Sequence, residues 1–174
     1  IEMTDSTDDS IREILSYQEN EADNEFGKFV KRNYLDWINR RDSSTPVMSH
    51  TLLRTRVFPI VEEHEKTTLL VIDNFRYDQW RTLSRDLAAQ FVIEEDLYFS
   101  ILPTVTQYAR NAIFSGLMPL QIEKMFPDLW IDEDEDEGKN LNERELIETQ
   151  LQRFRRKHTF SYNKANDSLA ADKI

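Results

Sequence analysis

A short apolar run that ends at an acidic residue places the strongest constraint on the fold of this chain. The run Thr67–Ile72, "TTLLVI", is rich in leucine and β-branched residues, shows no polar alternation, and is followed directly by Asp73. Such a run is typical of a strand that is buried on both faces of a parallel sheet. A carboxylate at the end of a buried strand is costly unless a partner binds it. The sequence therefore raises the question of what binds Asp73.

Helical and strand-like segments alternate after this run. Apolar residues have helical spacing over 77–91, residues 92–103 predict one or two strands, and a helix is expected from about Gln107 to Gly116, with a last strand at 159–163. Strands that alternate with helices imply right-handed crossovers. The sequence thus predicts an α/β fold with a parallel sheet, in which ligands bind beyond the carboxyl ends of the strands.

The first part of the chain has a helical pattern. Residues 1–41 carry apolar side chains at three- and four-residue spacings, and another helix is expected over 48–65, where Pro59 argues for a bend or an early end. We expect a small helical bundle or connector over residues 1–66, followed by a second domain over residues 67–174. The chain begins with isoleucine, and both of its ends are expected to be cut, so that the second domain is truncated.

Charge and cysteine content limit the partners. The chain has 174 residues, no cysteine and a net charge of −11, which repels nucleic acid and anionic membranes at long range. An anionic substrate would need a local positive group, and a metal ion is one candidate. The absence of cysteine excludes disulfides and thiolate–zinc sites. No apolar run approaches the roughly 20 residues that a membrane span needs, and no signal pattern opens the chain, so we expect a cytoplasmic protein.

Asp73 and Thr106 are the most informative candidates for chemistry. Each follows an apolar strand-like run, so a parallel sheet would place both at one edge. Asp73 is an oxygen ligand suited to zinc, magnesium or manganese, and Thr106 would lie at a helix N-terminus, which favours phosphate. A metal can lower the pKa of a hydroxyl group and make it a nucleophile. The alternatives are that Thr106 is only a helix N-cap and that Asp73 is a turn residue or a cap.

The segment Pro103–Pro119, "PTVTQYARNAIFSGLMP", resembles the nucleophile segment of the alkaline phosphatase superfamily in its phosphodiesterase and pyrophosphatase branch. The segment 73–80, "DNFRYDQW", resembles the first metal-binding segment of that branch. Within the superfamily the chain resembles the PglZ domain, in particular PglZ-domain response regulators of the PorX type. The matching positions of the nucleophile segment are Pro103, Thr104, Thr106, Ser115, Gly116 and Pro119.

This resemblance implies a zinc-dependent phosphohydrolase with two zinc ions in the complete domain. Asp73 would be a zinc ligand, and Thr106 would be both a ligand and the nucleophile that forms a phosphothreonine intermediate. The implied substrates are phosphodiesters such as linear or cyclic oligonucleotides. Arg110 and Asn111 lie one helical turn beyond Thr106, where either could touch a phosphate or be a helix-surface residue.

The resemblance leaves the ligand set incomplete. The remaining ligands of the family are aspartates and histidines further along the chain, whereas His50, His64 and His158 match no ligand motif and are expected at the surface or at helix ends. The fragment alone is therefore expected to be inactive. The acidic run 131–140 predicts a solvated loop, with calcium binding as the minor alternative because the EF-hand spacing is not met.

The family also implies partners. A receiver domain would precede this chain and a cognate histidine kinase would act on it, with a sigma factor or a subunit of the type IX secretion complex as a further partner. The helical segment could also form a homodimer. The alternative function is a non-catalytic signalling and protein-interaction module that regulates gene expression or secretion.

Overall fold

A computed structural model of the chain describes residues 2–39, 45–64, 66–130 and 141–165. The chain divides into two compact units, Ile1–Pro46 and Val47–Ile174. The expected boundary between residues 66 and 67 stays a prediction. The acidic run 131–140 lies outside the described residues, and so do the expectations attached to it.

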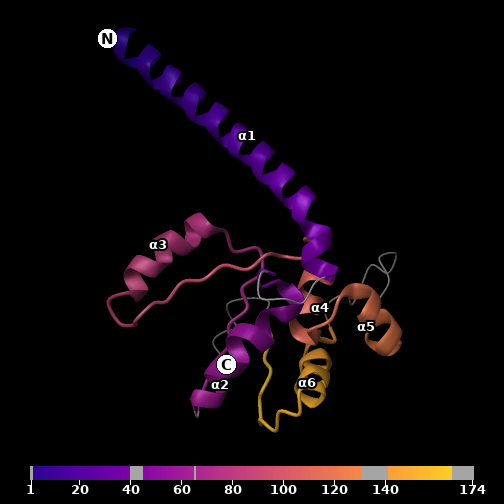
Figure 1. Ribbon diagram of the computed structural model, residues 1–174. Helices are drawn as coiled ribbons and strands as arrows, with labels where there is room; N and C mark the ends of the chain where they lie inside the picture. Colours follow the sequence, from indigo (N-terminus) through magenta and orange to yellow (C-terminus); the bar gives the residue numbers. More distant parts are fainter. Residues whose placement is uncertain (1, 40–44, 65, 131–140, 166–174) are drawn as a thin grey trace. The chain divides into compact units, whose positions relative to one another are not determined.

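The first unit contains one long helix. The helical pattern predicted for residues 1–41 is confirmed as α1, Glu2–Asn39, a helix of 38 residues (Figure 1). The helix contains no proline and only one glycine, Gly27, so nothing in its interior interrupts the backbone hydrogen bonds. Several large apolar side chains of α1 are exposed: Ile11, Ile14, Leu15, Phe26 and Phe29.

The second unit is built from short helices. The helix expected over 48–65 is present as three successive helical segments with different winding. Pro59 lies in the first turn of the last of them, where its missing N–H leaves no intrahelical hydrogen bond unmade. In chain order the elements of the unit are the 3₁₀ helix η1, Ser49–Thr51, the π-helix η2, Leu53–Val57, the α-helices α2, Phe58–Glu63, α3, Tyr77–Leu87, α4, Thr106–Ser115, and α5, Pro119–Met125, the 3₁₀ helix η3, Pro127–Leu129, and the α-helix α6, Glu143–Arg153.

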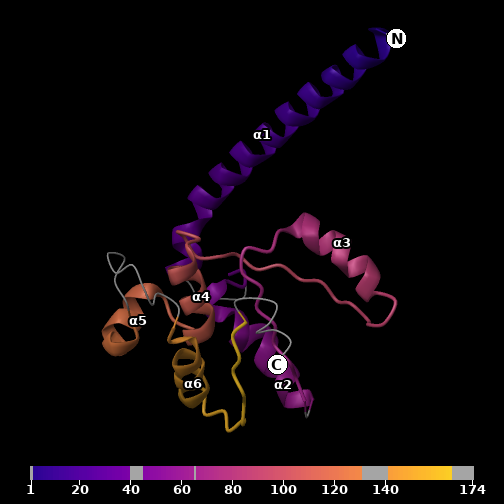
Figure 2. The ribbon, with the colours of Figure 1, turned by 180° about the vertical axis from the view of Figure 1, so that it is seen from behind.

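The predicted parallel-sheet α/β core is wrong for the part of the chain that the structure describes, which contains no strand. The run that was expected to be a buried strand is extended and exposed, with Leu70 79% accessible, and the segment after α3 has Val92 96% accessible. Figure 2 shows both flanks of α3 as plain coil. A strand needs a neighbour for its backbone groups, and no partner strand for these runs lies among the described residues. The strand expected at 159–163 is likewise coil.

One isolated parallel bridge, between Met48 and Phe99, replaces the expected sheet pairing. The Phe99 N–H donates to the Val47 carbonyl at 2.8 Å, and the Ser49 N–H donates to the Phe99 carbonyl at 3.1 Å. The Ile101 N–H donates to the Ser49 hydroxyl at 3.1 Å. Met48, Ser49 and Ile101 are fully buried, so the bridge fastens the segment that leads into α4 to the start of the second unit.

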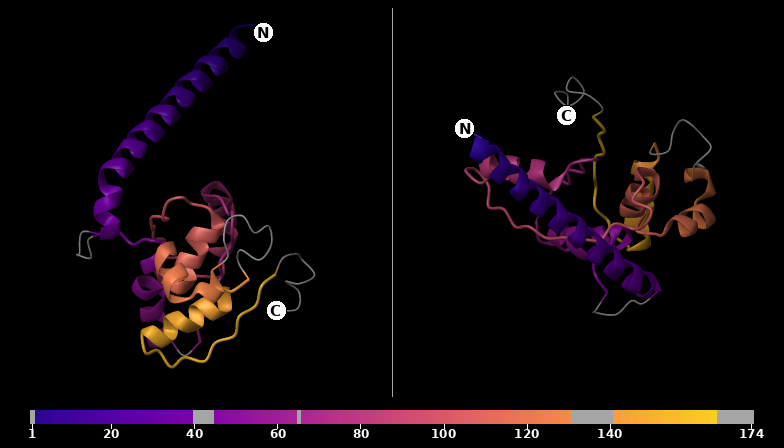
Figure 3. Two further views of the ribbon diagram at one scale, coloured as in Figure 1. Left: turned by 90° about the vertical axis from the view of Figure 1, so that its right-hand side faces the viewer. Right: turned by 90° about the horizontal axis from the view of Figure 1, so that it is seen from above.

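Helix α4 is the centre of the second unit. The predicted helix from Gln107 to Gly116 is confirmed, and residues 111–115 of α4 are all buried. One side of α4 places Ile113 in an apolar cluster with Leu53, Phe58 and Leu151. The next residue, Phe114, packs in a second cluster with Leu117, Ile122 and Leu146. Because α4 is enclosed on several sides and packs beside α6 (Figure 3), its first turn is held by the core behind it.

Helix α4 ends at Gly116, which has a left-handed backbone with φ of 65°. The Gly116 N–H donates to the Ala112 carbonyl at 2.9 Å, which closes the last turn. A Cβ atom at this position would overlap the side-chain amide of the buried Gln150. The position therefore requires glycine both for its backbone angle and for the close approach of α6.

Candidate functional site

Asp73 occupies a turn between the exposed apolar run and α3. The Asn74 N–H donates to Asp73 Oδ1 at 3.0 Å, and Asn74 itself has a left-handed backbone with φ of 55°, a conformation that asparagine tolerates. The N-cap of α3 is Arg76, whose backbone N–H donates to the Gln79 side chain. Asp73 is thus a turn residue and not the cap of α3, and its second carboxylate oxygen is directed elsewhere.

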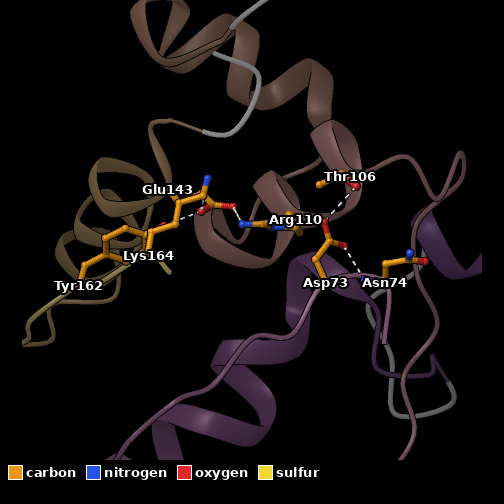
Figure 4. Close-up of polar contacts among 7 residues, drawn as sticks. All are labelled: Asp73, Asn74, Thr106, Arg110, Glu143, Tyr162 and Lys164. Atoms are coloured by element: carbon orange, nitrogen blue, oxygen red, sulfur yellow. Dashed lines mark hydrogen bonds and ion pairs between the residues drawn. The ribbon is translucent and has the colours of Figure 1, made fainter. Parts of the chain in front are cut away.

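Thr106 is the first residue of α4 and follows the N-cap Val105. The N-cap position belongs to Val105, so Thr106 is not the capping residue of this helix. The hydroxyl instead donates a long hydrogen bond of 3.4 Å to Asp73 Oδ2 (Figure 4). Residues 33 positions apart in the chain therefore place two oxygen atoms side by side.

Arg110 adds a positive charge to this pair. It lies one helical turn after Thr106 on the same face of α4, and its Nη1 atom lies 3.1 Å from Asp73 Oδ2. Its Nη2 atom forms an ion pair with Glu143 Oε1. Figure 4 shows the Arg110 side chain between the two carboxylates. The Arg110 side chain is 18% exposed, so both ion pairs are partly shielded from water.

Glu143 is the first residue of α6, and its side chain has no solvent exposure. The Tyr162 hydroxyl donates to Glu143 Oε2 at 2.5 Å, and Lys164 Nζ lies 3.5 Å from the same oxygen. The N-terminus of α6 also favours a negative charge at this position. These groups together compensate the buried carboxylate, which would otherwise be strongly destabilising.

The environment of Glu143 changes the titration of its neighbour. Burial, and then the hydrogen bond to Glu143, raise the pKa of the Tyr162 phenol above its ordinary value. The charge of Glu143 acts in the same direction, whereas Arg110 opposes it. Tyr162 therefore stays protonated and continues to donate to Glu143 well beyond neutral pH.

The structure brings Asp73, Thr106 and Arg110 together, but not at the edge of a sheet as the sequence argument expected. Asn111 is buried, and a helix of 3.6 residues per turn places it roughly 100° around the axis from Arg110. A role for Asn111 in contacting a substrate stays a prediction, as do the roles of the other three residues.

Three residues of this site were not predicted, namely Glu143, Tyr162 and Lys164. The sequence does contain a signal for the first of them. Glu143 lies three and four residues before Leu146 and Ile147, which places its carboxylate on the apolar face of α6. An acid on the buried face of a helix needs a cationic partner, and that need could have directed attention to Arg110.

Asp73 and Thr106 fit a zinc ion in chemistry but make up only part of a ligand set. Carboxylate and hydroxyl oxygens are suitable donors, and a zinc site typically has about four ligands. Over the described residues, no three histidine, cysteine, aspartate or glutamate side chains lie close enough together to hold a metal ion. Of the three histidines, His64 and His158 are exposed and His50 is half-buried.

Comparison with known families identifies the class of protein. Residues 52–172 match the BREX system PglZ alkaline phosphatase-like domain, and this chain belongs to that family. Residues 1–38 match the linker domain of the PorX response regulator. The combination is that of a PglZ-domain response regulator of the PorX type. No curated protein matches the chain.

None of the helices in the described ranges is long and apolar enough to cross a membrane.

Proposed function

We propose that this chain is part of the effector of a two-component response regulator and that the effector is a zinc-dependent phosphodiesterase. Membership of an alkaline phosphatase-like family and the match to a response-regulator linker support this proposal. The observation that carries it is the 3.4 Å approach of the Thr106 hydroxyl to Asp73, with Arg110 on the same carboxylate oxygen. A hydroxyl, a carboxylate and a guanidinium group are the parts that a phosphoryl-transfer site uses.

Thr106 is the nucleophile in this proposal. Its hydroxyl loses its proton to solvent, its oxygen bonds to phosphorus, the bond from phosphorus to the leaving oxygen breaks, and the departing alkoxide takes up a proton from solvent. Water then attacks the phosphothreonine and releases the phosphomonoester. Asp73 orients the hydroxyl, and the Arg110 fork is suited to phosphate oxygens. Asp73 and Thr106 would hold zinc, which when bound lowers the pKa of a hydroxyl group and screens negative charge.

The same side chains support a phosphodiester as the substrate. A diester with one negative charge suits a single arginine, and linear or cyclic oligonucleotides are diesters of this kind. The overall charge of −11 opposes binding of a long nucleic acid, so short substrates are favoured. The cognate histidine kinase and an upstream receiver domain would control the activity, and a sigma factor or a subunit of the secretion complex would be the target or partner.

Replacement of Thr106 tests the proposal in the full-length protein. Thr106→Ala should abolish release of nitrophenolate from bis(p-nitrophenyl) phosphate in the presence of zinc, while Thr106→Ser, which keeps a hydroxyl group, should retain part of it. Thr82→Ala is the matched control, because Thr82 is an exposed threonine of α3 whose hydroxyl bonds only within its own helix. Turnover by Thr106→Ala at the wild-type rate would remove the nucleophile from the proposal.

A non-catalytic signalling module is the second candidate. The observation in its favour is that no three histidine, cysteine, aspartate or glutamate side chains of the described residues lie close enough together to hold a metal ion, whereas residues 1–38 match a linker of a regulatory protein. In this case the exposed apolar side chains of α1 would contact a protein partner or a second copy. The two candidates differ in one result: a Thr106→Ala protein that regulates normally in cells supports the module and opposes the enzyme.

A further inference from the structure

The candidate site contains a buried acid to which the proposed reaction assigns no role. Glu143 has no solvent exposure and lies on α6, whereas Thr106 and Arg110 lie on α4 and Asp73 lies in a turn. Its carboxylate forms ion pairs with Arg110 and Lys164 and accepts a hydrogen bond from the Tyr162 hydroxyl. A buried carboxylate with this many partners is fixed in position much more firmly than an exposed one.

Arg110 connects this fixed acid to the exposed one. Asp73 is 46% exposed and belongs to a turn beside an exposed, extended segment, so it cannot by itself fix a long side chain. Glu143 holds the other end of the guanidinium group through Nη2. Because the guanidinium group is planar and rigid, fixing one Nη atom also fixes the direction of the other. The orientation of Arg110 at Asp73 is therefore set from α6.

We infer that Glu143 is a positioning residue that holds the Arg110 guanidinium group at the Asp73–Thr106 pair, where Arg110 binds the phosphate oxygens of the substrate. This inference rests on the proposed function, since it assigns Arg110 a phosphate to bind. The simpler interpretation is that the Glu143–Arg110 ion pair only joins α6 to α4. The two interpretations differ in whether the effect of Glu143 on substrate depends on Arg110.

A double-mutant cycle separates them. Wild type, Glu143→Gln, Arg110→Gln and the double variant of the full-length protein are compared by kcat and KM for bis(p-nitrophenyl) phosphate and by the affinity for inorganic phosphate in calorimetry. Glu143→Gln should lower kcat/KM by ~10- to 100-fold, mainly through KM, because a small displacement of a binding group has effects of this size. In the Arg110→Gln background the same change should have less than about a twofold effect.

Two further variants complete the design. Glu145→Gln is the matched control, because Glu145 is an exposed acid in the same first turn of α6 and its replacement should leave KM unchanged. Arg110→Lys keeps the charge but cannot bridge two carboxylates with a planar fork, so it should raise KM as Glu143→Gln does. This variant keeps the inference testable if Glu143→Gln fails to fold.

The outcomes are distinct. Equal losses from Glu143→Gln in both backgrounds, or a wild-type KM in Arg110→Lys, would overturn the positioning role. If wild type shows no turnover, the proposed function fails while phosphate calorimetry on the same four proteins still decides the inference. Phosphate binding that needs Glu143 only when Arg110 is present supports it, and the absence of phosphate binding overturns it.

Discussion

The Nη1 atom of Arg110 lies 3.1 Å from Asp73 Oδ2, the same oxygen atom that accepts the Thr106 hydroxyl. Thr106 and Arg110 are four residues apart on one face of α4, so a single carboxylate spans one helical turn. The contact ties the turn at Asp73 to the start of the central helix. It also pairs the negative charge of Asp73 with the positive charge of Arg110.

Asp73 should matter more for function than for stability. Because its side chain is 46% exposed, loss of its ion pair in Asp73→Asn should change the free energy of unfolding by less than about 1 kcal/mol. Turnover of a model diester should fall by about 100-fold or more, because Asp73 orients the Thr106 hydroxyl. Urea unfolding and nitrophenolate release measure the two effects, with Asp86→Asn on the exposed side of α3 as control. A variant that unfolds easily but still turns over diester would contradict this division.

Glu143, in contrast to Asp73, should contribute strongly to the free energy of unfolding. Glu143→Ala leaves Arg110, Tyr162 and Lys164 without their shared acceptor, and breaking a buried ion pair on one side costs about 3–5 kcal/mol. We expect the lower end of this range, because Arg110 and Lys164 keep some access to water. Glu148→Ala, an exposed acid of the same helix, should stay within about 0.5 kcal/mol of wild type. Equal unfolding midpoints for the two variants would show that the network contributes little.

Tyr162 should make the folded state sensitive to alkaline pH. Its pKa is raised in the folded chain by burial and by Glu143, so the folded state holds the phenolic proton more tightly than the unfolded state does. The resulting stability is fully present below the ordinary phenol pKa of 10.0 and is lost as the pH rises above it. Thermal unfolding across this range should therefore show a smaller loss for Tyr162→Phe than for wild type. Tyr77→Phe, which removes an exposed phenol, should follow the wild-type curve.

Two glycines should respond in opposite directions to the same change. Gly116→Ala puts a Cβ atom against Gln150 and forces alanine into a left-handed backbone, which alone costs roughly 1–2 kcal/mol. Gly27→Ala lies within α1 with no atom within 4 Å of the new Cβ, and it should stabilise the helix by roughly 0.5–1 kcal/mol. Circular dichroism at 222 nm during thermal unfolding measures both. Destabilisation by Gly27→Ala would mean that α1 is not helical at that point.

The sequence was sufficient for several of the helices and for the approach of Thr106 to Asp73. Helical spacing located α1, α3 and α4, and Gly116 marked the end of α4, because these signals depend on neighbours a few residues apart. The family assignment was also correct, since the residues around Thr106 carry a specific pattern. A strand, in contrast, forms only when a second strand pairs with it. The run before Asp73 has the composition of a buried strand, but it stays exposed and unpaired in the described structure.

The other half of the site depended on tertiary contacts. Glu143 lies 33 residues after Arg110, and no local spacing indicates that α6 packs beside the first turns of α4. Tyr162 and Lys164 follow α6 in an extended segment with no regular pattern, so their approach to Glu143 could not be deduced from periodicity. Only the position of Glu143 on an apolar helix face pointed to a buried partner.

The backbone hydrogen bonds of Phe99 to Val47 and Ser49 have an evolutionary consequence. These bonds hold together the two ends of the segment 50–98. Insertions or deletions within that segment would therefore leave the start of α4 in the same place. Thr106, which follows the segment, would keep its position, whereas Asp73, which lies within the segment, would move with it. The two halves of the pair should therefore tolerate length variation very differently among relatives.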